Sequence, residues 1–277
     1  MHEYTIGKAI FKDYTLTRYI DEGAYGKVYL VKSSIGLPFA LKVLHKDVAM
    51  EQRGIKSVMQ IRSSRLVNII DYGKTVNDKD CILMEYIQDN LEEVLKKGVV
   101  ESKLAEHYFI ELLKGLQVLE SNGIIHRDIK PNNLFILEDI IKIGDFGTAR
   151  YISEESTKMT SGLGTMHYSA PESFGEQFGC SVDHWSACVV LYRMLCGKLL
   201  FDYTTNPRAL FRAIQLESPD LSPVPDKYHL FFEKCFQKDV DKRYKDSSDL
   251  MAAFERIINQ PVEGSVQSQQ PNTARQK

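Results

Sequence analysis

Two parts of this 277-residue sequence carry residues suited to binding phosphate groups. DEGAYGKV (21–28) nearly matches G-x-G-x-x-G-x-V, a pattern whose glycines let the backbone approach phosphates. Gly23 and Gly26 are present, whereas Asp21 occupies the first glycine position. Further along, IIHRDIKPNNLFI (124–136) and GDFGTAR (144–150) concentrate aspartate, lysine and asparagine. The hairpin at 21–28 is either a nucleotide-binding loop with one tolerated substitution or the relic of one in a chain that no longer does chemistry.

A further segment, GTMHYSAPE (164–172), follows GDFGTAR in the chain. HRDIKPNN, DFG and APE in this order and at this spacing resemble the eukaryotic-type protein kinase family, serine/threonine branch, over roughly residues 14–260. The resemblance implies an α+β, bilobal fold with a small antiparallel β-rich N-lobe (about 14–87) and a larger helical C-lobe (about 88–260). It also implies a protein serine/threonine kinase that transfers the γ-phosphate of ATP to hydroxyl groups of protein substrates.

The resemblance assigns roles to four polar residues of the second part. Asp128 is similar to the carboxylate that accepts a hydrogen bond from the substrate hydroxyl and orients it towards the γ-phosphate. We expect Lys130 to place a positive charge beside the transferring group. We expect Asn133 and Asp145 to bind Mg²⁺ through their side-chain oxygens. These side chains fit phosphoryl transfer, which needs positioning and charge neutralisation more than covalent catalysis.

The resemblance also implies an ATP site in the N-terminal part. Lys42, in FALK, is expected to reach the α- and β-phosphates from a strand. Met84 resembles the gatekeeper, and Glu85–Ile87 resembles the hinge whose backbone pairs with adenine. Asp89 and Asn90 lie where the family often places a ribose contact. The ATP-binding residues that we expect are Gly23, Tyr25, Gly26, Val28, Ala40, Lys42, Glu85 and Ile87.

Two features imply substrate class and regulation. Lys130 and Thr165 are typical of the serine/threonine branch, in which the threonine hydroxyl contacts the catalytic loop. Arg127, beside the catalytic aspartate, resembles an arginine that pairs with a phosphate on the loop between DFG and APE. Thr160, or its neighbour Ser161, is the expected phosphorylation site.

Other residues of the motifs are expected to hold the site together. The resemblance implies that Glu172 pairs with Arg243, and the directional geometry of a bidentate arginine–carboxylate pair suits this anchoring contact. Asp183 resembles an aspartate that accepts hydrogen bonds from the catalytic-loop backbone. His126 and Phe146 resemble members of an apolar spine, so His126 is interpreted as a packed side chain and not as a general base.

One expected residue is missing from its usual place. The helix after Lys42 should carry a glutamate that pairs with this lysine, but a gap-free alignment puts Ser57 there. Gln60 and Glu51 are the alternatives, of which Gln60 is neutral and Glu51 lies early in the helix. Asp145 is another possible partner for the lysine. The departure leaves open a pseudokinase that binds nucleotide without catalysis.

Two further alternatives concern the substrate. A small-molecule kinase of the aminoglycoside or choline type shares the Asp-x-x-x-x-Asn loop, but the APE segment favours a peptide substrate. Glu92 and Glu93 could bind a basic residue of such a peptide, although exposed helix carboxylates are usually just solvated.

Hydrophobic patterning predicts elements that can position these residues. Strand-like runs dominate the first ninety residues and helical periodicity dominates the rest. We expect strands at YTLTRYI (14–20), KVYLVK (27–32), PFALKVL (38–44), CILMEYI (81–87), LFIL (134–137) and IIKIGD (140–145). We expect helices at about 46–62, 103–119, 183–195 and 249–259, the third one buried and ended by Gly197. Residues 261–277 are polar and are expected to form a disordered tail or linker.

Composition limits the partners. The net charge of −2 favours neither nucleic acid nor a membrane surface, and no apolar run is long enough to span a bilayer. Five scattered cysteines without a CxxC pair are expected to be reduced thiols of a cytoplasmic protein. The expected ligands are ATP, Mg²⁺ and protein substrates, and the oligomeric state stays open.

Overall fold

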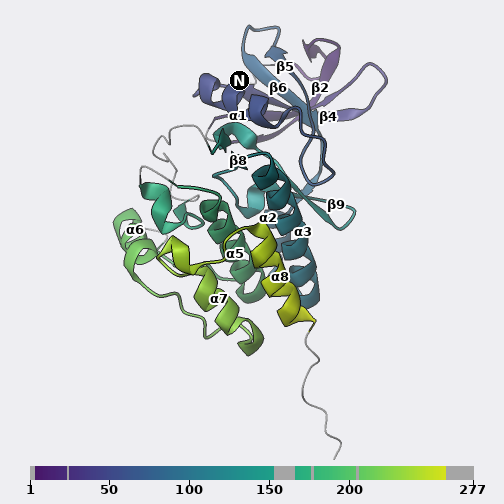
Figure 1. Cartoon of the computed structure of the whole chain (residues 1–277). Helices are drawn as coiled ribbons and strands as arrows, with labels where there is room; N and C mark the ends of the chain where they lie inside the picture. Colours follow the sequence, from purple (N-terminus) through teal and green to yellow (C-terminus); the bar gives the residue numbers. More distant parts are fainter. Residues whose placement is uncertain (1–3, 24, 153–165, 176–177, 204–205, 260–277) are drawn as a thin grey trace, which may run out of the picture.

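The computed structural model describes residues 4–23, 25–152, 166–175, 178–203 and 206–259, and arranges them in two lobes (Figure 1). The N-terminal lobe contains a six-stranded antiparallel sheet with strand order β1-β2-β3-β4-β6-β5. The strands are β1 (Ala9–Phe11), β2 (Tyr14–Glu22), β3 (Gly26–Lys32), β4 (Pro38–Leu44), β5 (Ile69–Lys74) and β6 (Asp80–Glu85). Four of them confirm the predicted runs to within two residues at each end, whereas β1 and β5 were not predicted.

The segment before β2, residues 4–11, ends in the edge strand β1 and is called the N-terminal strap below. Its side chains of Tyr4, Ile10 and Phe11 are buried in one apolar cluster with residues of the sheet. The Tyr4 ring meets Tyr29 edge to face at 5.6 Å, and the backbone N–H of Val76 donates to the carbonyl of Ile10 at 3.0 Å. The folded lobe therefore includes residues ahead of the predicted boundary at residue 14.

Helix α1 (Val48–Val58) packs on the opposite face of the sheet, where Ile55 lies against Leu44 and Ile82. It starts two residues after the expected 46, because Asp47 has a left-handed backbone (φ 50°) that cannot belong to the helix, and it ends at Val58, before the expected 62. The helix also lies against the 3₁₀ turn Phe146–Thr148 of the other lobe. At this contact a Cβ on Gly54 would overlap the carbonyl oxygen of Phe146, so only glycine allows so close an approach.

The C-terminal lobe is helical (Figure 1). In the described residues its helices are α2 (Leu91–Leu95), α3 (Ser102–Ser121), α5 (Ser181–Cys196), α6 (Pro207–Leu216), α7 (His229–Cys235) and α8 (Ser247–Ile258). Helices α3, α5, α7 and α8 contribute to the main apolar core. As predicted, α5 is buried along almost its whole length and ends at Gly197, which has φ 68°.

Helices α6 and α7 were not predicted. The sequence does carry a start signal for α6, since the Asn206 side chain accepts a hydrogen bond from the N–H of Ala209 at 3.1 Å and Pro207 occupies the first turn. Both helices are short, ten and seven residues, so periodicity alone distinguishes them poorly from loops.

Short paired strands fix the loops that carry the predicted site. β8 (Ile124–Ile125) pairs with β11 (Arg150–Tyr151), and β9 (Leu134–Leu137) pairs with β10 (Ile140–Ile143) and β7 (Asp89–Asn90). The predicted catalytic loop, residues 126–133, lies between β8 and β9, and Asp145 lies shortly after β10. The two predicted strands of this lobe are thereby confirmed.

Two further expectations can be compared with the fold. Within the described ranges, none of the helices has the length and apolar character that crossing a membrane requires. All five cysteines are free thiols, of which Cys81, Cys188 and Cys235 are buried. The predicted tail, 261–277, lies outside the described residues.

Candidate active site

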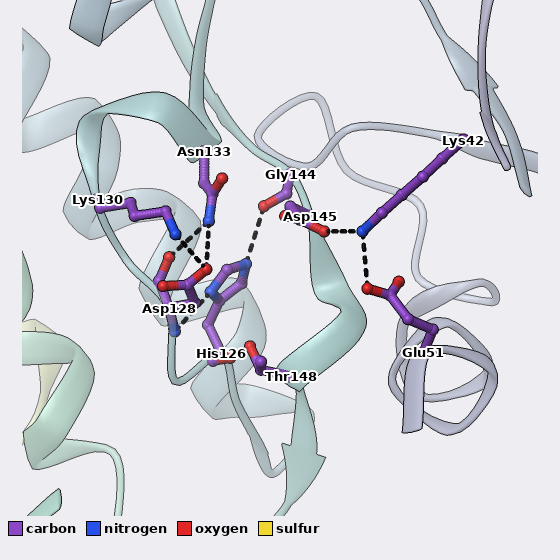
Figure 2. Close-up of polar contacts among 9 residues, drawn as sticks. All are labelled: Lys42, Glu51, His126, Asp128, Lys130, Asn133, Gly144, Asp145 and Thr148. Carbon is purple, nitrogen blue, oxygen red and sulfur yellow. Dashed lines mark hydrogen bonds and ion pairs between the residues drawn. The ribbon is translucent and has the colours of Figure 1, made fainter. Parts of the chain in front are cut away.

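The catalytic-loop residues converge on the carboxylate of Asp128 (Figure 2). Its Oδ2 accepts hydrogen bonds from Lys130 Nζ at 2.8 Å and from Asn133 Nδ2 at 3.0 Å. Asn133 Nδ2 also donates to the backbone carbonyl of Asp128 at 2.8 Å. In contrast, Oδ1 is buried, and no described residue donates to it. The carboxylate is therefore fixed through one oxygen and keeps an acceptor on the other.

Asp183 fixes the backbone of the loop that carries Asp128. Its two carboxylate oxygens accept hydrogen bonds from the backbone N–H groups of His126 at 2.6 Å and Arg127 at 2.8 Å. Arg127 has a left-handed backbone (φ 72°), and these bonds stabilise that conformation. Burial raises the pKa of Asp183, although the N–H donors and His126 lower it. The predicted contact of Asp183 is thus present.

His126 and Phe146 pack together in the core, as predicted. Their ring centroids are 5.4 Å apart in an edge-to-face arrangement. His126 Nε2 hydrogen-bonds the carbonyl of Gly144 at 3.0 Å, and Thr148 Oγ1 donates to the carbonyl of His126 at 2.9 Å (Figure 2). These bonds join the catalytic loop to the segment that carries Asp145.

Lys42 lies between two carboxylates. Its Nζ is 2.7 Å from Glu51 Oε1 and 2.7 Å from Asp145 Oδ1 (Figure 2). Burial lowers the pKa of this lysine, but the attraction of Asp145 and Glu51 is larger in sum and raises it. Burial in turn raises the pKa of Asp145, yet Lys42 keeps it below its ordinary value. The lysine is therefore a permanent cation that links the two lobes.

Glu51 is the glutamate that seemed to be missing, so the gap-free alignment to Ser57 was wrong. Glu51 lies in the first turn of α1 with a side chain only 1% exposed. Only His45–Asp47 separate β4 from α1, so the first turn already faces Lys42. Ser57 lies about 9 Å further along the helix axis and donates to the carbonyl of Arg53. Gln60 lies beyond the end of α1 and is exposed.

The predicted adenine-binding residues share one face of the sheet. In the register of β3, β4 and β6, Val28 is opposite Lys42 and Ala40 is opposite Met84. Ala40 and Lys42 are two positions apart on β4, so the side chains of all four lie on the same side. This is the face that carries α1 and faces the other lobe.

The two glycines of the hairpin, Gly23 and Gly26, differ in the space around their Cα atoms. A Cβ on Gly26 would lie 2.5 Å from the carbonyl oxygen of Val43, whereas a Cβ on Gly23 would meet no atom within 4 Å. Gly26 is therefore required by the sheet itself, and Gly23 leaves open space for a ligand. The Tyr25 ring lies 5.9 Å from Lys42 Nζ, a cation–π distance.

Glu85 is held by two residues that the sequence did not indicate. Its carboxylate lies 2.5 Å from Lys142 Nζ and accepts a hydrogen bond from the backbone N–H of Asn68 at 2.6 Å. Its own N–H donates to the carbonyl of Asn68 at 3.0 Å. Backbone pairing with adenine would then use the carbonyl of Glu85 and the backbone of Ile87. Asn90, which is expected near the ribose, caps α2: its side-chain oxygen accepts a hydrogen bond from the N–H of Glu93 at 3.0 Å.

Residues 166–174, which include the APE motif (170–172), are called the platform segment below. Its Glu172 forms the predicted bidentate pair with Arg243, at 2.7 Å from Nη1 and 2.9 Å from Nη2. The Arg243 guanidinium also lies 4.7 Å from the Trp185 ring. The platform segment is thereby fixed to the helical core. Thr165 and the phosphorylation candidates Thr160 and Ser161 lie outside the described residues.

The oxygen set of the site fits a magnesium ion that phosphate oxygens complete. Asn133 uses its Nδ2 on Asp128, so its amide oxygen remains for a metal. Asp145 uses Oδ1 on Lys42, and its side chain is 37% exposed. In the part of the chain that the structure describes, no group of three or more His, Cys, Asp or Glu residues could hold a metal alone. Mg²⁺ usually binds through one or two carboxylates plus water and substrate phosphates, which matches this sparse set.

Comparison with known proteins agrees with the site. The protein kinase domain pattern matches residues 14–259. A probable serine/threonine-protein kinase of Clostridium acetobutylicum is 29% identical and matches 93% of this chain and 42% of its own length. The RAC-beta serine/threonine-protein kinase of Rattus norvegicus is 31% identical, over 78% of this chain and 48% of its own length. MAP3K epsilon protein kinase 1 of Brassica napus is 31% identical, over 85% of this chain and 19% of its own length.

The chain spans less than half the length of these curated relatives. The domain match nevertheless covers most of the chain, and it includes every residue of the converging site from Lys42 to Asp145. The chain belongs to the protein kinase family.

Proposed function

We propose that this chain transfers the γ-phosphate of ATP to serine and threonine hydroxyls of proteins. The observation that carries the proposal is the Asp128 carboxylate, whose Oδ2 is held by Lys130 and Asn133 while Oδ1 is buried without a described donor. A buried acceptor that lacks a donor is costly, and a substrate hydroxyl would satisfy it. The relatives named serine/threonine-protein kinases support the choice of acceptor.

In this proposal the side chains around Asp128 orient the attacking group. Asp128 Oδ1 accepts the hydroxyl hydrogen and directs the oxygen towards the phosphate. Lys130, 2.8 Å from Oδ2, holds the carboxylate in place and lies beside the charge that develops on the phosphoryl oxygens. Asn133 fixes the rotation of the carboxylate through its second hydrogen bond. Thr165 would add a hydroxyl contact to this loop.

Asn133 and Asp145 would hold Mg²⁺, which supplies positive charge for the phosphate oxygens when bound. Lys42 contacts the α- and β-phosphates, and Glu51 keeps its ammonium group in place from α1. Gly23 and Gly26 let the hairpin approach the phosphates, while Val28 and Ala40 enclose the adenine together with the backbone of Glu85–Ile87.

Regulation and location form the less direct part of the proposal. Arg127, whose guanidinium lies 5.3 Å from the Phe178 ring, would pair with a phosphate on Thr160 or Ser161. The five free thiols support a cytoplasmic protein. The kinase domain is taken as 14–260, with residues 261–277 as a tail or linker.

The test is incubation with Mg²⁺, labelled ATP, and a mixture of one basic and one acidic generic protein. We expect label on serine or threonine of a protein, with Asp128→Asn slower by roughly 10²–10⁴-fold at unchanged thermal unfolding. The pseudokinase alternative requires that the chain binds ATP and labels nothing, itself included. Label on a small alcohol but on no protein would instead support the small-molecule kinase. The paired Glu51 removes the main argument for the pseudokinase.

A further inference from the structure

An ion pair joins α2 to α5 beside the platform segment. Arg193 Nη1 donates to Glu92 Oε2 at 2.6 Å, and Nη2 donates to Glu92 Oε1 at 2.9 Å. The two residues are 101 positions apart in the sequence. Their side chains are 20% and 16% exposed, so the pair lies at the rim of the protein and not in its core. Both carboxylate oxygens are therefore occupied by one guanidinium in bidentate geometry.

Tyr168 connects this pair to the candidate active site. Its hydroxyl accepts a hydrogen bond from Arg193 Nη1 at 2.6 Å. Its backbone carbonyl accepts a hydrogen bond from Ser186 Oγ at 2.7 Å, which fixes the platform segment to α5. Tyr168 and Asp128 line the same small cavity, together with Arg127 and Ser169. One tyrosine side chain thus separates the catalytic loop from the ion pair.

This separation matches the reach of a bound peptide. An extended chain advances roughly 3.3–3.6 Å per residue, so residues two or three positions from the acceptor lie roughly 7–10 Å from it. That span is comparable to the length of a tyrosine side chain with one hydrogen bond. Flanking residues of a peptide whose hydroxyl contacts Asp128 would accordingly pass close to Glu92 and Arg193.

We propose that Arg193 determines peptide specificity by neutralising Glu92, so that the enzyme does not select basic residues flanking the acceptor. The proposal rests on the function proposed above. Both glutamates that the sequence offered for binding a basic residue are already paired, since Glu93 lies 2.6 Å from Lys96. An arginine in the peptide would have to displace Arg193, which is held within the fold at no cost in association entropy. The arginine of the peptide would also be repelled by the positive charge of the Arg193 guanidinium.

The pairs differ in exposure, and this difference supplies a matched control. Lys96 and Glu93 are 60% and 54% exposed, so freeing Glu93 leaves a solvated carboxylate of little consequence. Freeing Glu92 instead leaves a poorly solvated carboxylate beside Tyr168. A peptide cation would therefore bind more favourably to the freed Glu92 than to the freed Glu93.

The experiment compares Arg193→Met with the wild type, with Lys96→Met as the matched control. The probes are three alanine-rich peptides with one serine, carrying an arginine two residues before it, three residues before it, or none. The readouts are kcat/KM and, independently of transfer, peptide binding by fluorescence anisotropy. The wild type and Lys96→Met are expected to treat the three peptides nearly equally. Arg193→Met is expected to favour an arginine peptide by roughly tenfold or more.

A second pair of variants keeps the proposal testable if Arg193→Met folds poorly. In Glu92→Gln/Arg193→Met the carboxylate is removed, so the preference should disappear. The exchange Glu92→Arg/Arg193→Glu rebuilds the pair in reverse and should again show no preference. A wild type that already prefers arginine and loses this preference in Glu92→Gln overturns the proposal, as does an Arg193→Met variant with unchanged ratios in both readouts. If no variant transfers phosphate, the function proposed above fails, while the binding ratios still decide this inference.

Discussion

Lys42 and Glu51 form a buried ion pair at 2.7 Å across the interface between β4 and α1. The same ammonium group lies 2.7 Å from Asp145, which belongs to the other lobe. A cation shared by two carboxylates stabilises only the arrangement in which all three elements meet. The geometry of the site therefore depends on the position of α1.

Glu51→Gln is expected to lower kcat/KM for phosphoryl transfer by about 10- to 100-fold, because Lys42 loses one of its two anionic partners. Burial raises the pKa of Glu51, although Lys42 lowers it. The ionised, paired form is consequently lost as the pH falls through this raised value. The wild type should lose activity on the acid side, and Glu51→Gln should lack this limb of the pH–rate profile.

The other two helix candidates provide controls for this variant. Ser57→Ala and Gln60→Ala should keep kcat/KM within about twofold of the wild type, because neither side chain contacts Lys42. A loss of activity in Ser57→Ala with none in Glu51→Gln would reverse the assignment.

Gly54→Ala tests the close contact between α1 and the Phe146–Thr148 turn. Alanine favours a helix by about 1 kcal/mol over glycine, but here its Cβ would overlap the carbonyl oxygen of Phe146. We expect a net loss of about 1–3 kcal/mol in the free energy of unfolding, and lower kcat/KM, because α1 must move away. Gly179→Ala is the matched control, since its Cβ would meet nothing within 4 Å. Equal stability of the two variants would contradict this contact.

Asp145→Ala tests the magnesium assignment. Transfer should fall by at least roughly 10²-fold, and Mg²⁺ should no longer increase ATP affinity in calorimetric titrations. The chain should still fold, because Lys42 retains Glu51 as a partner. Retained transfer, or an unchanged effect of Mg²⁺ on ATP binding, would remove Asp145 from the metal site.

Glu120 tests a link between α3 and α8. Burial alone would raise its pKa, but the His184 ring, 3.6 Å away, and hydrogen bonds from Ser247 lower it from the ordinary 4.5 to about 2. The backbone N–H of Ser247, the first residue of α8, donates to Glu120 Oε2 at 3.0 Å. A lowered pKa means that the carboxylate stabilises the fold above pH 4.5, and that this contribution is lost as the pH falls towards 2.

We expect Glu120→Gln to lower the free energy of unfolding by about 1–3 kcal/mol at pH 7, a range reduced for the partial exposure of the side chain. The difference from the wild type should shrink at pH 3. Urea unfolding at both pH values measures it. Glu255→Gln, at an exposed position of α8, should show no such difference. A difference that grows on acidification would contradict the sign of the pKa shift.

The sequence predicted the fold best where motifs and periodicity coincide. The β4 run and the buried α5 helix were located closely because apolar runs and a terminal glycine delimit them. Strand β5 was not predicted, since IIDYGK alternates only weakly and contains Gly73. The start of α1 was misplaced because the left-handed backbone of Asp47 is not visible in the pattern.

Within the site, fixed spacing predicted the geometry of Asp128 and Asn133, since one short loop holds both. Glu51 was misjudged because the gap-free alignment ran back from Asn68, whereas the glutamate lies in the first turn of α1, shortly after the end of β4. The pairing of Arg193 with Glu92, and of Lys142 with Glu85, could not be predicted, because no local pattern relates residues so far apart.

The N-terminal strap has a practical consequence for anyone who shortens this protein. The family match begins at residue 14, so a fragment cut at that boundary would lack Tyr4, Ile10 and Phe11. The apolar surfaces of Tyr29 and Val31 that they cover would become exposed to water, on a lobe whose first paired strand is also gone. Such a fragment would be prone to aggregate and could be mistaken for an inactive enzyme. Expression vectors should retain the residues from Tyr4 onwards.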